Sequence, residues 1–426
     1  MTDLKLTAEE QAFLDGAAGA GARRAMEIVV SLARIYGAGD LVPVKHVQIA
    51  GVSYKNLGDA GVAFLSEWAA EGARVRVPTT LNPMGMERGR WKSWGIKPEF
   101  AGPQLSVLDA FVKMGVTPTL SCTPYLFADY APRRGDALAW AESSAVAFAN
   151  AVIGARSNRE GGPSALAAAI VGRTARYGYH LDENRLADTV VEVRCPVRSV
   201  ADFGALSYVA GRAVGNCVPW FADLGQWLPP LPADITLGGP AGDRLKTLGA
   251  GLAAYGAVTL YHVAGYTPEA RDSGEVLLRR DARRLVIHDL DEAYRVMDAD
   301  PDLRNIDLVT IGCPHASLSE IQKVAEHLRG KTLTTRLWVT TAEITRQRAR
   351  ELGFVQTIEA AGGEVVADTC AVVAPMQMLE VHSMATNAGK MACYAPMHSG
   401  VRMRFGDVEQ CLDAAVTGTW KEPNHD

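Results

Sequence analysis

The sequence predicts an α/β fold built on parallel, doubly wound sheets. Two observations carry this prediction. From about residue 285, short β-branched runs alternate with amphipathic helical patterns, as expected for a β-α-β-α-β series. In addition, three of the seven cysteines each follow a short apolar run, at the point where a buried strand would end. The chain has 426 residues, 48% of them hydrophobic, which is enough to form two or more domains.

Composition excludes several classes of protein. The net charge is −5 and the basic residues form no long block, which argues against a nucleic-acid or anionic-membrane surface. No apolar run approaches the roughly 18–20 residues needed to cross a bilayer. The N-terminus is acidic and helical rather than a signal peptide, with Thr7 and Glu10 as a capping box. We therefore expect a cytoplasmic protein with reduced thiols, whose cysteines fill the core, catalyse or bind metal.

The first part of the chain, residues 1–284, reads as an N-terminal α/β catalytic region of one or two subdomains. We expect strands within residues 41–52, 73–83 and 115–124, then a long helix over 137–154. Small residues on most faces of that helix suit packing on several sides. Residues 188–197 resemble a strand, and residues 251–265 a helix that leads into a strand.

The second part, residues 285–380, is more regular. Strands are expected within 305–314, 335–341 and 364–372, and helices over 317–330 and 342–363. This is a doubly wound β-α-β-α-β domain, in which cysteines that follow two of the strands reach the same edge of the sheet. The remaining segment, 381–426, is expected to pack back on the catalytic region.

The three strand-end cysteines are Cys122, Cys313 and Cys370. In open α/β sheets the ligand crevice lies at the carboxyl ends of the strands, and three thiolates converging there could hold an iron–sulfur cluster with one iron open. A free cysteine usually only packs, and we assign no role to the other four, which are Cys195, Cys217, Cys393 and Cys411. No C-x-x-C motif is present, which argues against a zinc ribbon or a ferredoxin-type cluster.

Two histidines are candidate catalytic residues. His315 lies two residues after Cys313 and could be a ligand, a general acid, a hydrogen-bond donor to a ligand, or a turn histidine without chemistry. His262 ends an apolar run, at the end of an expected strand. His180 is a weaker candidate.

Several other polar residues are candidates for substrate binding. Ser143 and Ser144 would be costly on an apolar helix unless that helix lined a pocket or a seam between domains. Arg156, Asn158 and Arg159 precede a Gly-Gly pair and suit a carboxylate or phosphate, although an ion pair with Glu160 would explain the arginines equally simply.

Two polar loops complete this set. Asn82 follows an expected strand and could bind substrate or form an Asx-turn. Lys390 is a candidate catalytic cation for an anionic substrate, or a solvated surface lysine.

Seven motifs resemble the aconitase X family, in its large subunit or large catalytic region. They are SCTPY, WAESSAVAFAN, IGARSNREGG, GYTPEA, GCPHASLSE, ADTC and ATNAGKMACY. The resemblance extends over nearly the whole chain. The family usually has Asn-Ser where this chain has Asn150-Ala151, and TNSAK where it has TNAGK, so two hydroxyls are missing.

The resemblance implies an aconitase-like multi-domain arrangement around a central cluster cleft, and a hydro-lyase whose iron–sulfur cluster, 2Fe–2S or 4Fe–4S, acts as a Lewis acid. Cys122, Cys313 and Cys370 would be the ligands, and His315 and His262 would transfer a proton or orient the hydroxyl. The implied substrate is cis-3-hydroxy-L-proline or mevalonate 5-phosphate. An Ala- and Arg-rich composition with few Lys and Ile favours the first, because it suits a mesophilic bacterium.

The resemblance also implies a partner. Family members carry a small swivelling domain, fused or separate, whose Gly/Ser-rich loop supplies a catalytic serine. No segment of this sequence resembles that Gly/Ser-rich loop, so we expect a separate small subunit. Two rival interpretations stay open: a binding scaffold without a cluster, and a zinc or mononuclear iron hydrolase that uses Cys313, His315 and Cys370.

Overall fold

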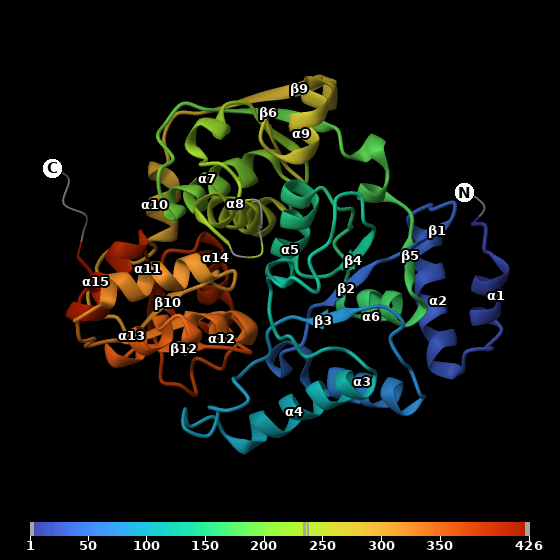
Figure 1. Cartoon of the computed structure of the whole chain (residues 1–426), viewed down its shortest axis with the longest axis horizontal. Coiled ribbons are helices and arrows are strands. Elements are labelled where there is room, and N and C mark those ends of the chain that lie inside the picture. Colours follow the sequence, from blue (N-terminus) through green and yellow to red (C-terminus); the bar gives the residue numbers. More distant parts are fainter. Residues whose placement is uncertain (1–3, 233–235, 237, 422–426) are drawn as a thin grey trace.

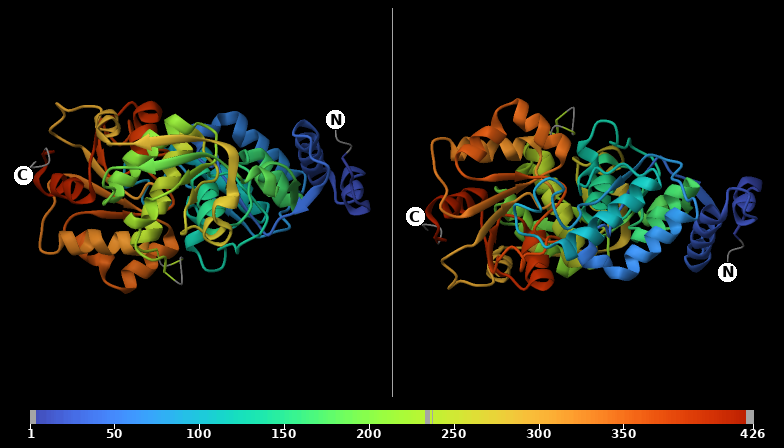
Figure 2. Two further views of the ribbon diagram at one scale, coloured as in Figure 1. Left: turned by 90° about the horizontal axis from the view of Figure 1, so that it is seen from above. Right: turned by 90° about the horizontal axis from the view of Figure 1, so that it is seen from below.

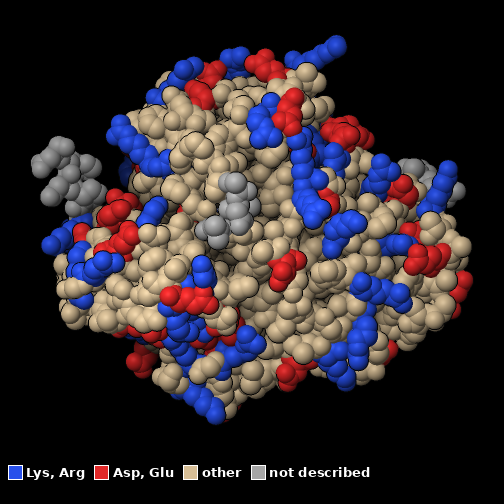
Figure 3. Space-filling model, viewed as in Figure 1, with Lys and Arg blue, Asp and Glu red and all other residues tan. Residues whose placement is uncertain are grey.

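The computed structural model describes residues 4–232, 236 and 238–421. It contains three parallel sheets and a short antiparallel pair of strands, with helices packed around them (Figure 1). The two N-terminal helices lie at one end of the molecule and the five-stranded sheet at the other, as the views from above and below also show (Figure 2). Charged residues of both signs are interspersed over the face in Figure 3. Within the described residues, no helix is long and apolar enough to cross a membrane.

The first sheet is three-stranded, in the order β3-β2-β4, and all of its strand residues are buried. Buried parallel strands need helices on both faces, and helices from the N-terminal half supply this cover. The elements of this part are α1 (Ala8–Leu14), α2 (Ala20–Ile35), β1 (Leu41–Pro43), β2 (His46–Ile49), α3 (Tyr54–Ala70), β3 (Thr79–Leu81), α4 (Pro98–Lys113), β4 (Leu138–Trp140), α6 (Gly162–Val171) and β5 (Arg173–Ala175).

The second sheet is four-stranded and parallel, in the order β8-β7-β6-β9. Two of its helices, Val200–Val214 and Pro240–Gly256, pack so closely that only glycine fits at the contact. A Cβ on Gly256 would lie 2.3 Å from the carbonyl oxygen of Gly211. The elements are α5 (Ser143–Phe148), which packs on α8, then β6 (Ala187–Val193), α7 (Val200–Val214), β7 (Pro219–Phe221), α8 (Pro240–Gly256), β8 (His262–Val263), α9 (Pro268–Ser273), β9 (Leu278–Ile287) and α10 (Asp291–Met297).

The third sheet is five-stranded and parallel, in the order β12-β11-β10-β13-β14. The chain runs outward from β10 through β11 to β12, then returns to the other side of β10, so the strand order reverses between β10 and β13. Such a switch point is where ligands bind in open α/β sheets. The elements are β10 (Leu308–Ile311), α11 (Leu318–Leu328), β11 (Arg336–Thr340), α12 (Glu343–Glu351), α13 (Phe354–Ala360), β12 (Glu364–Val366), β13 (Ser383–Thr386), α14 (Gly389–Ser399), β14 (Arg402–Phe405) and α15 (Val408–Thr417).

The α/β class, the doubly wound series and the Thr7 capping box are confirmed. The helix expected over 137–154 was wrong at its start: residues 138–140 form β4, and α5 begins only after Glu142, whose side chain accepts from the Ser144 amide. The helix expected over 342–363 breaks at Gly353, where φ is 81°. Residues 115–124 contain no strand beyond an isolated bridge from Thr117 to Thr80.

The segment 381–426 also differs from expectation. It supplies β13 and β14, which belong to the same sheet as β10–β12, so residue 380 marks no boundary in this sheet. The reason is the return of the chain across β10, which local patterning does not reveal. Helix α14 packs against α7 and α8, and Met384 of β13 and Met403 of β14 join the hydrophobic core of the N-terminal part.

Candidate active site

A cavity of about 280 Å³ opens where the first and third sheets face each other. Cys122, Cys313 and Cys370 all line it, although no strand directly precedes Cys122. The lining also includes polar groups from both parts of the chain: Asn56, Asn82, Glu142, Ser143, Arg159, Lys390, Tyr394 and His398. The cavity therefore joins residues more than 300 positions apart in the sequence, and it lies at the carboxyl ends of parallel strands, as the sequence suggested.

Each cysteine sits on a different loop. Cys313 follows β10, Cys370 lies four residues after β12, and Cys122 belongs to a segment that runs beside β3. The Cys122 sulfur accepts a hydrogen bond of 3.2 Å from the His315 amide. Burial raises the pKa of all three thiols, that of Cys122 to about 12, although the nearby ammonium of Lys390 opposes the shift. These thiols would ionise only with a bound cation to compensate them.

This set of donors fits an iron–sulfur cluster. Thiolates are the usual protein ligands of such clusters, and three thiols lining one cavity leave one position without a cysteine. Among the described residues no group of three or more His, Cys, Asp or Glu side chains, these three cysteines included, is arranged to hold a single metal ion. The hydrolase interpretation needs a free ring nitrogen on His315, but Ser121 and Thr369 engage both nitrogens.

Glu142 and Lys390 form a buried ion pair in this cavity. The carboxylate also accepts from the Asn82 amide at 2.7 Å and from the Ser144 hydroxyl at 2.9 Å. Burial alone would raise the pKa of Glu142, but Lys390 and these donors hold it at about 2. The pKa of Lys390 is raised, because Glu142 and the cysteines outweigh its burial. Both groups are thus charged at neutral pH.

Sequence reasoning passed over Glu142, because it read residues 137–154 as one helix. The usable signal was the apolar run that ends at Trp140: a carboxylate that follows a buried strand lies at the same edge as the cysteines. Gln48 connects the two strands there, since its amide donates to Asn82 at 3.0 Å and its carbonyl accepts from the Glu142 backbone.

Among the predicted residues, Asn82, Ser143, Arg159 and Lys390 line the cavity with the cysteines. Ser144 lies beside it and contacts Glu142 and Lys390. Arg159 is exposed at the rim, and the part of the chain that the structure describes offers its side chain no acidic partner. The alternative, an ion pair with Glu160, is not formed, because that carboxylate accepts from Ser164 and Thr174.

Two of the predicted substrate-binding residues, Arg156 and Asn158, lie away from the cavity. Arg156 donates to the His180 carbonyl and pairs with Asp182, and Asn158 bonds the backbone of Tyr177 and Tyr179, so both hold the 177–182 segment.

The two candidate histidines are buried outside the lining. His262 contacts the Arg185 carbonyl at 2.9 Å in the second sheet. His315 lies behind the cysteines, with both ring nitrogens engaged.

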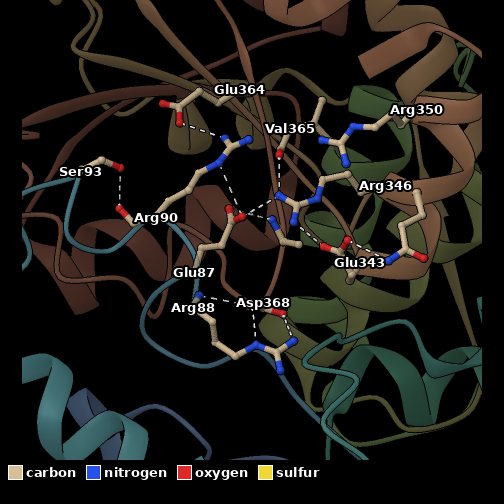
Figure 4. Close-up of polar contacts among 12 residues, drawn as sticks. Glu87, Arg88, Arg90, Ser93, Glu343, Arg346, Arg350, Glu364, Val365 and Asp368 are labelled. Atoms are coloured by element: carbon tan, nitrogen blue, oxygen red, sulfur yellow. Dashed lines mark hydrogen bonds and ion pairs between the residues drawn. The ribbon is translucent and has the colours of Figure 1, made fainter. Parts of the chain in front are cut away.

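A charged seam holds the Cys370 loop against the N-terminal part of the chain (Figure 4). Arg88 bonds both carboxylate oxygens of Asp368, two residues before Cys370. The buried carboxylate of Glu87 accepts from Arg346 at 2.6 Å and from the Ala367 amide at 3.3 Å. The position of one cysteine therefore depends on contacts made by residues far away in sequence.

Known proteins match this chain along its length. Family models described as the first, second and third domains of aconitase X match residues 3–183, 187–295 and 306–417. A phosphomevalonate dehydratase large subunit of Methanosarcina mazei is 43% identical over 97% of both chains. A cis-3-hydroxy-L-proline dehydratase of Pseudomonas aeruginosa is 35% identical over 97% of this chain but only 70% of its own length. The crystal structure of holo-form aconitase X of Thermococcus kodakaraensis is 42% identical, with a TM-score of 0.85, and covers 97% of this chain and 100% of that one.

The fold, the polar cavity and relatives named as dehydratases define an enzyme of the hydro-lyase class. Within that class, the chain belongs to the aconitase X family. The resemblance read from the motifs is thereby confirmed, and so is the aconitase X-like arrangement of the fold.

Proposed function

We propose that this chain is the large subunit of an iron–sulfur-dependent phosphomevalonate dehydratase. The observation that carries the proposal is the convergence of Cys122, Cys313 and Cys370 with the Glu142–Lys390 pair in one cavity. The reaction breaks the bond to the β-hydroxyl, removes the α-proton and forms a double bond conjugated with the carboxylate, with water as the second product.

The relatives support this substrate over cis-3-hydroxy-L-proline, which composition had favoured. Four relatives named phosphomevalonate dehydratase large subunit are 43% identical and match over 95% or more of their own length. The two cis-3-hydroxy-L-proline dehydratases are 32% and 35% identical, and this chain covers about 70% of each. Composition was a weak guide, since it reflects the habitat of an organism rather than the chemistry of a site.

In this proposal Cys122, Cys313 and Cys370 hold the cluster, whose type we leave open between 2Fe–2S and 4Fe–4S. When bound, the cluster supplies a Lewis acid for the departing hydroxyl. The nearby ammonium of Lys390 favours the thiolate forms that ligation needs, as its effect on the pKa of each thiol indicates.

The chain's own residues bind and orient the substrate. Lys390, held in place by Glu142, pairs with the carboxylate of the substrate close to the cysteines. Asn82 and Ser143 supply hydrogen bonds to the substrate. Arg159, which stands at the rim without an acidic partner in the described chain, binds the phosphate. A serine from a separate small subunit removes the α-proton. His315 and His262 take no direct part.

The test is anaerobic co-expression with a small subunit, followed by assay of both substrates. We expect a brown protein that dehydrates mevalonate 5-phosphate in preference to cis-3-hydroxy-L-proline. Iron and acid-labile sulfide should be lost in Cys122→Ala, Cys313→Ala and Cys370→Ala. A preference for cis-3-hydroxy-L-proline would overturn the proposal that mevalonate 5-phosphate is the substrate. A colourless wild-type protein with neither iron nor sulfide would instead favour a scaffold without a cluster.

Arg159→Met gives a sharper test of phosphate binding. We expect KM for mevalonate 5-phosphate to rise by about tenfold or more, equivalent to roughly 1.5–3 kcal/mol for a lost hydrogen bond to a charged group. Arg156→Met is the matched control, because that arginine lies three residues away but outside the cavity lining. An equal rise in KM for both variants would contradict the assignment.

A further inference from the structure

The three cysteine loops meet at one residue, His315, which is completely buried. Its backbone amide donates to the Cys122 sulfur at 3.2 Å. Its ring contacts Ser121, the residue before Cys122, at 3.1 Å from Nδ1, and the carbonyl of Thr369, the residue before Cys370, at 3.1 Å from Nε2. Its own loop carries Cys313, two residues earlier. One side chain thus joins the loops of all three cysteines.

The partners determine the tautomer of this imidazole. A backbone carbonyl can only accept, so Nε2 carries the proton and donates it to Thr369. Nδ1 then has a lone pair, and it accepts from the Ser121 hydroxyl. Both nitrogens are occupied and the ring lies outside the cavity lining, so His315 has no free nitrogen for a metal or a substrate.

The surroundings of His315 are fixed as well. The Ser121 oxygen also contacts the Thr123 hydroxyl at 3.1 Å and accepts from the Thr123 amide at 3.2 Å, which braces both neighbours of Cys122. The His315 carbonyl accepts from the buried ammonium of Lys246 on α8 at 3.2 Å. The His315 ring thus contacts the Cys122 and Cys370 loops, while its backbone bonds Cys122 and Lys246.

We infer that His315 is a positioning residue that sets the relative placement of the three cysteine loops, and that it is neither a metal ligand nor a proton donor. This inference rests on the proposed cluster. It predicts that removal of the ring contacts weakens retention of the cluster while the fold persists. Residues that orient metal ligands typically contribute 10–100-fold to metal affinity, so the effect should be measurable.

The experiment compares anaerobically purified His315→Leu, His315→Gln and Ser121→Ala with the wild-type chain. The readouts are iron and sulfide per chain, the electron paramagnetic resonance spectrum of the reduced cluster, and the rate of iron loss to a chelator. We expect His315→Leu to lose iron about tenfold faster or more, with an altered spectrum. His315→Gln places an amide donor near Thr369 and should recover most of the retention. Ser121→Ala should be intermediate.

His262→Leu is the matched control, because His262 is also a buried histidine with a ring contact to a backbone carbonyl, but that carbonyl belongs to Arg185 and not to a cysteine loop. It should retain iron like the wild type. If His315→Leu does not fold, His315→Gln and Ser121→Ala still decide the matter, because both keep most of the buried volume.

Wild-type retention and spectrum in His315→Leu would overturn the inference, whether or not activity is lost. Equal iron loss in His262→Leu would also overturn it, because the effect would then reflect general destabilisation. A wild-type chain that binds no iron would instead contradict the proposed function. The inference about His315 would then fail as well, because it rests on the proposed cluster.

Discussion

Arg88 and Asp368 form a two-pronged ion pair, with Nε to Oδ2 at 2.8 Å and Nη2 to Oδ1 at 3.0 Å (Figure 4). Asp368 is buried and has a φ of 64°, a left-handed conformation that aspartate tolerates better than most side chains. It precedes Cys370 by two residues, and its carbonyl accepts from the Met84 amide. The N-terminal part of the chain thus holds this cysteine loop at Asp368 through two contacts, from Arg88 and Met84.

Removal of Arg88 should therefore loosen that loop. In Arg88→Met, the carboxylate of Asp368 stays buried without its charged partner, which should lower the free energy of unfolding by about 1–3 kcal/mol. Urea denaturation measures this effect. Arg348→Met is the control, because Arg348 pairs with Glu351 on an exposed helix surface and should change stability by less than about 0.5 kcal/mol. Equal losses of unfolding free energy in the two variants would show that the Arg88–Asp368 ion pair does not hold the loop.

The second prediction concerns the Glu142–Lys390 pair. Lys390→Met leaves a buried carboxylate unpaired and should destabilise the chain by roughly 3–5 kcal/mol. The double variant Glu142→Gln/Lys390→Met removes both charges and should recover most of that stability while it stays inactive. Denaturation and turnover together test this. A double variant as unstable as Lys390→Met would mean that the ammonium packs there for reasons other than charge.

The third prediction is a pH dependence caused by His46. Burial lowers the pKa of His46 from 6.5 to about 3, and its Nδ1 accepts from the Trp140 indole at 2.8 Å. The unfolded chain therefore binds a proton below pH 6.5 that the folded chain does not. The stability that His46 contributes is complete above pH 6.5 and falls as the pH drops toward 3.

The size of this effect can be calculated. Between pH 6.5 and 5 the loss should be about 2 kcal/mol, at roughly 1.4 kcal/mol for each pH unit. The variant His46→Gln keeps an acceptor near Trp140 but does not titrate. In it the slope of unfolding free energy against pH should fall by roughly 1.4 kcal/mol per pH unit. An unchanged slope would mean that His46 is protonated in the folded state.

The parts of the fold that sequence predicted are those with a strong local pattern. The alternation of strands and helices after residue 285 placed Cys313 and Cys370 at one edge of a sheet, and the structure agrees. The β13–β14 return was not predictable, because strand order across a sheet depends on contacts distant in sequence. Leu138–Trp140 was misassigned because a strand of three residues has no period to detect.

The site was predictable to a similar degree. Predicted positions after strands found Cys313, Cys370 and Asn82, which line the cavity. Cys122 lines it too, although residues 115–121 form no strand beyond an isolated bridge, and Lys390 was predicted as a cation in a polar loop. Arg156 and Asn158 were grouped with Arg159 because they are neighbours in sequence, but the backbone turns them toward the 177–182 segment. The function of His315 depends on contacts with residues 121 and 369, which no local pattern encodes.

The last prediction concerns Gly312, which precedes Cys313 and has a φ of 103°. A Cβ at this position would lie 2.2 Å from the Thr340 carbonyl oxygen, so Gly312→Ala cannot fit without movement of the β10–α11 turn. Gly330→Ala is the control, because Gly330 also has a positive φ, of 74°, but open space around it. The control should cost only about 1–2 kcal/mol for its backbone conformation. We expect Gly312→Ala to cost clearly more and to release iron as Cys313 is displaced, as denaturation and iron analysis would show. Equal costs for the two variants would mean that the turn adapts, and that the close approach to Thr340 does not fix the position of Cys313.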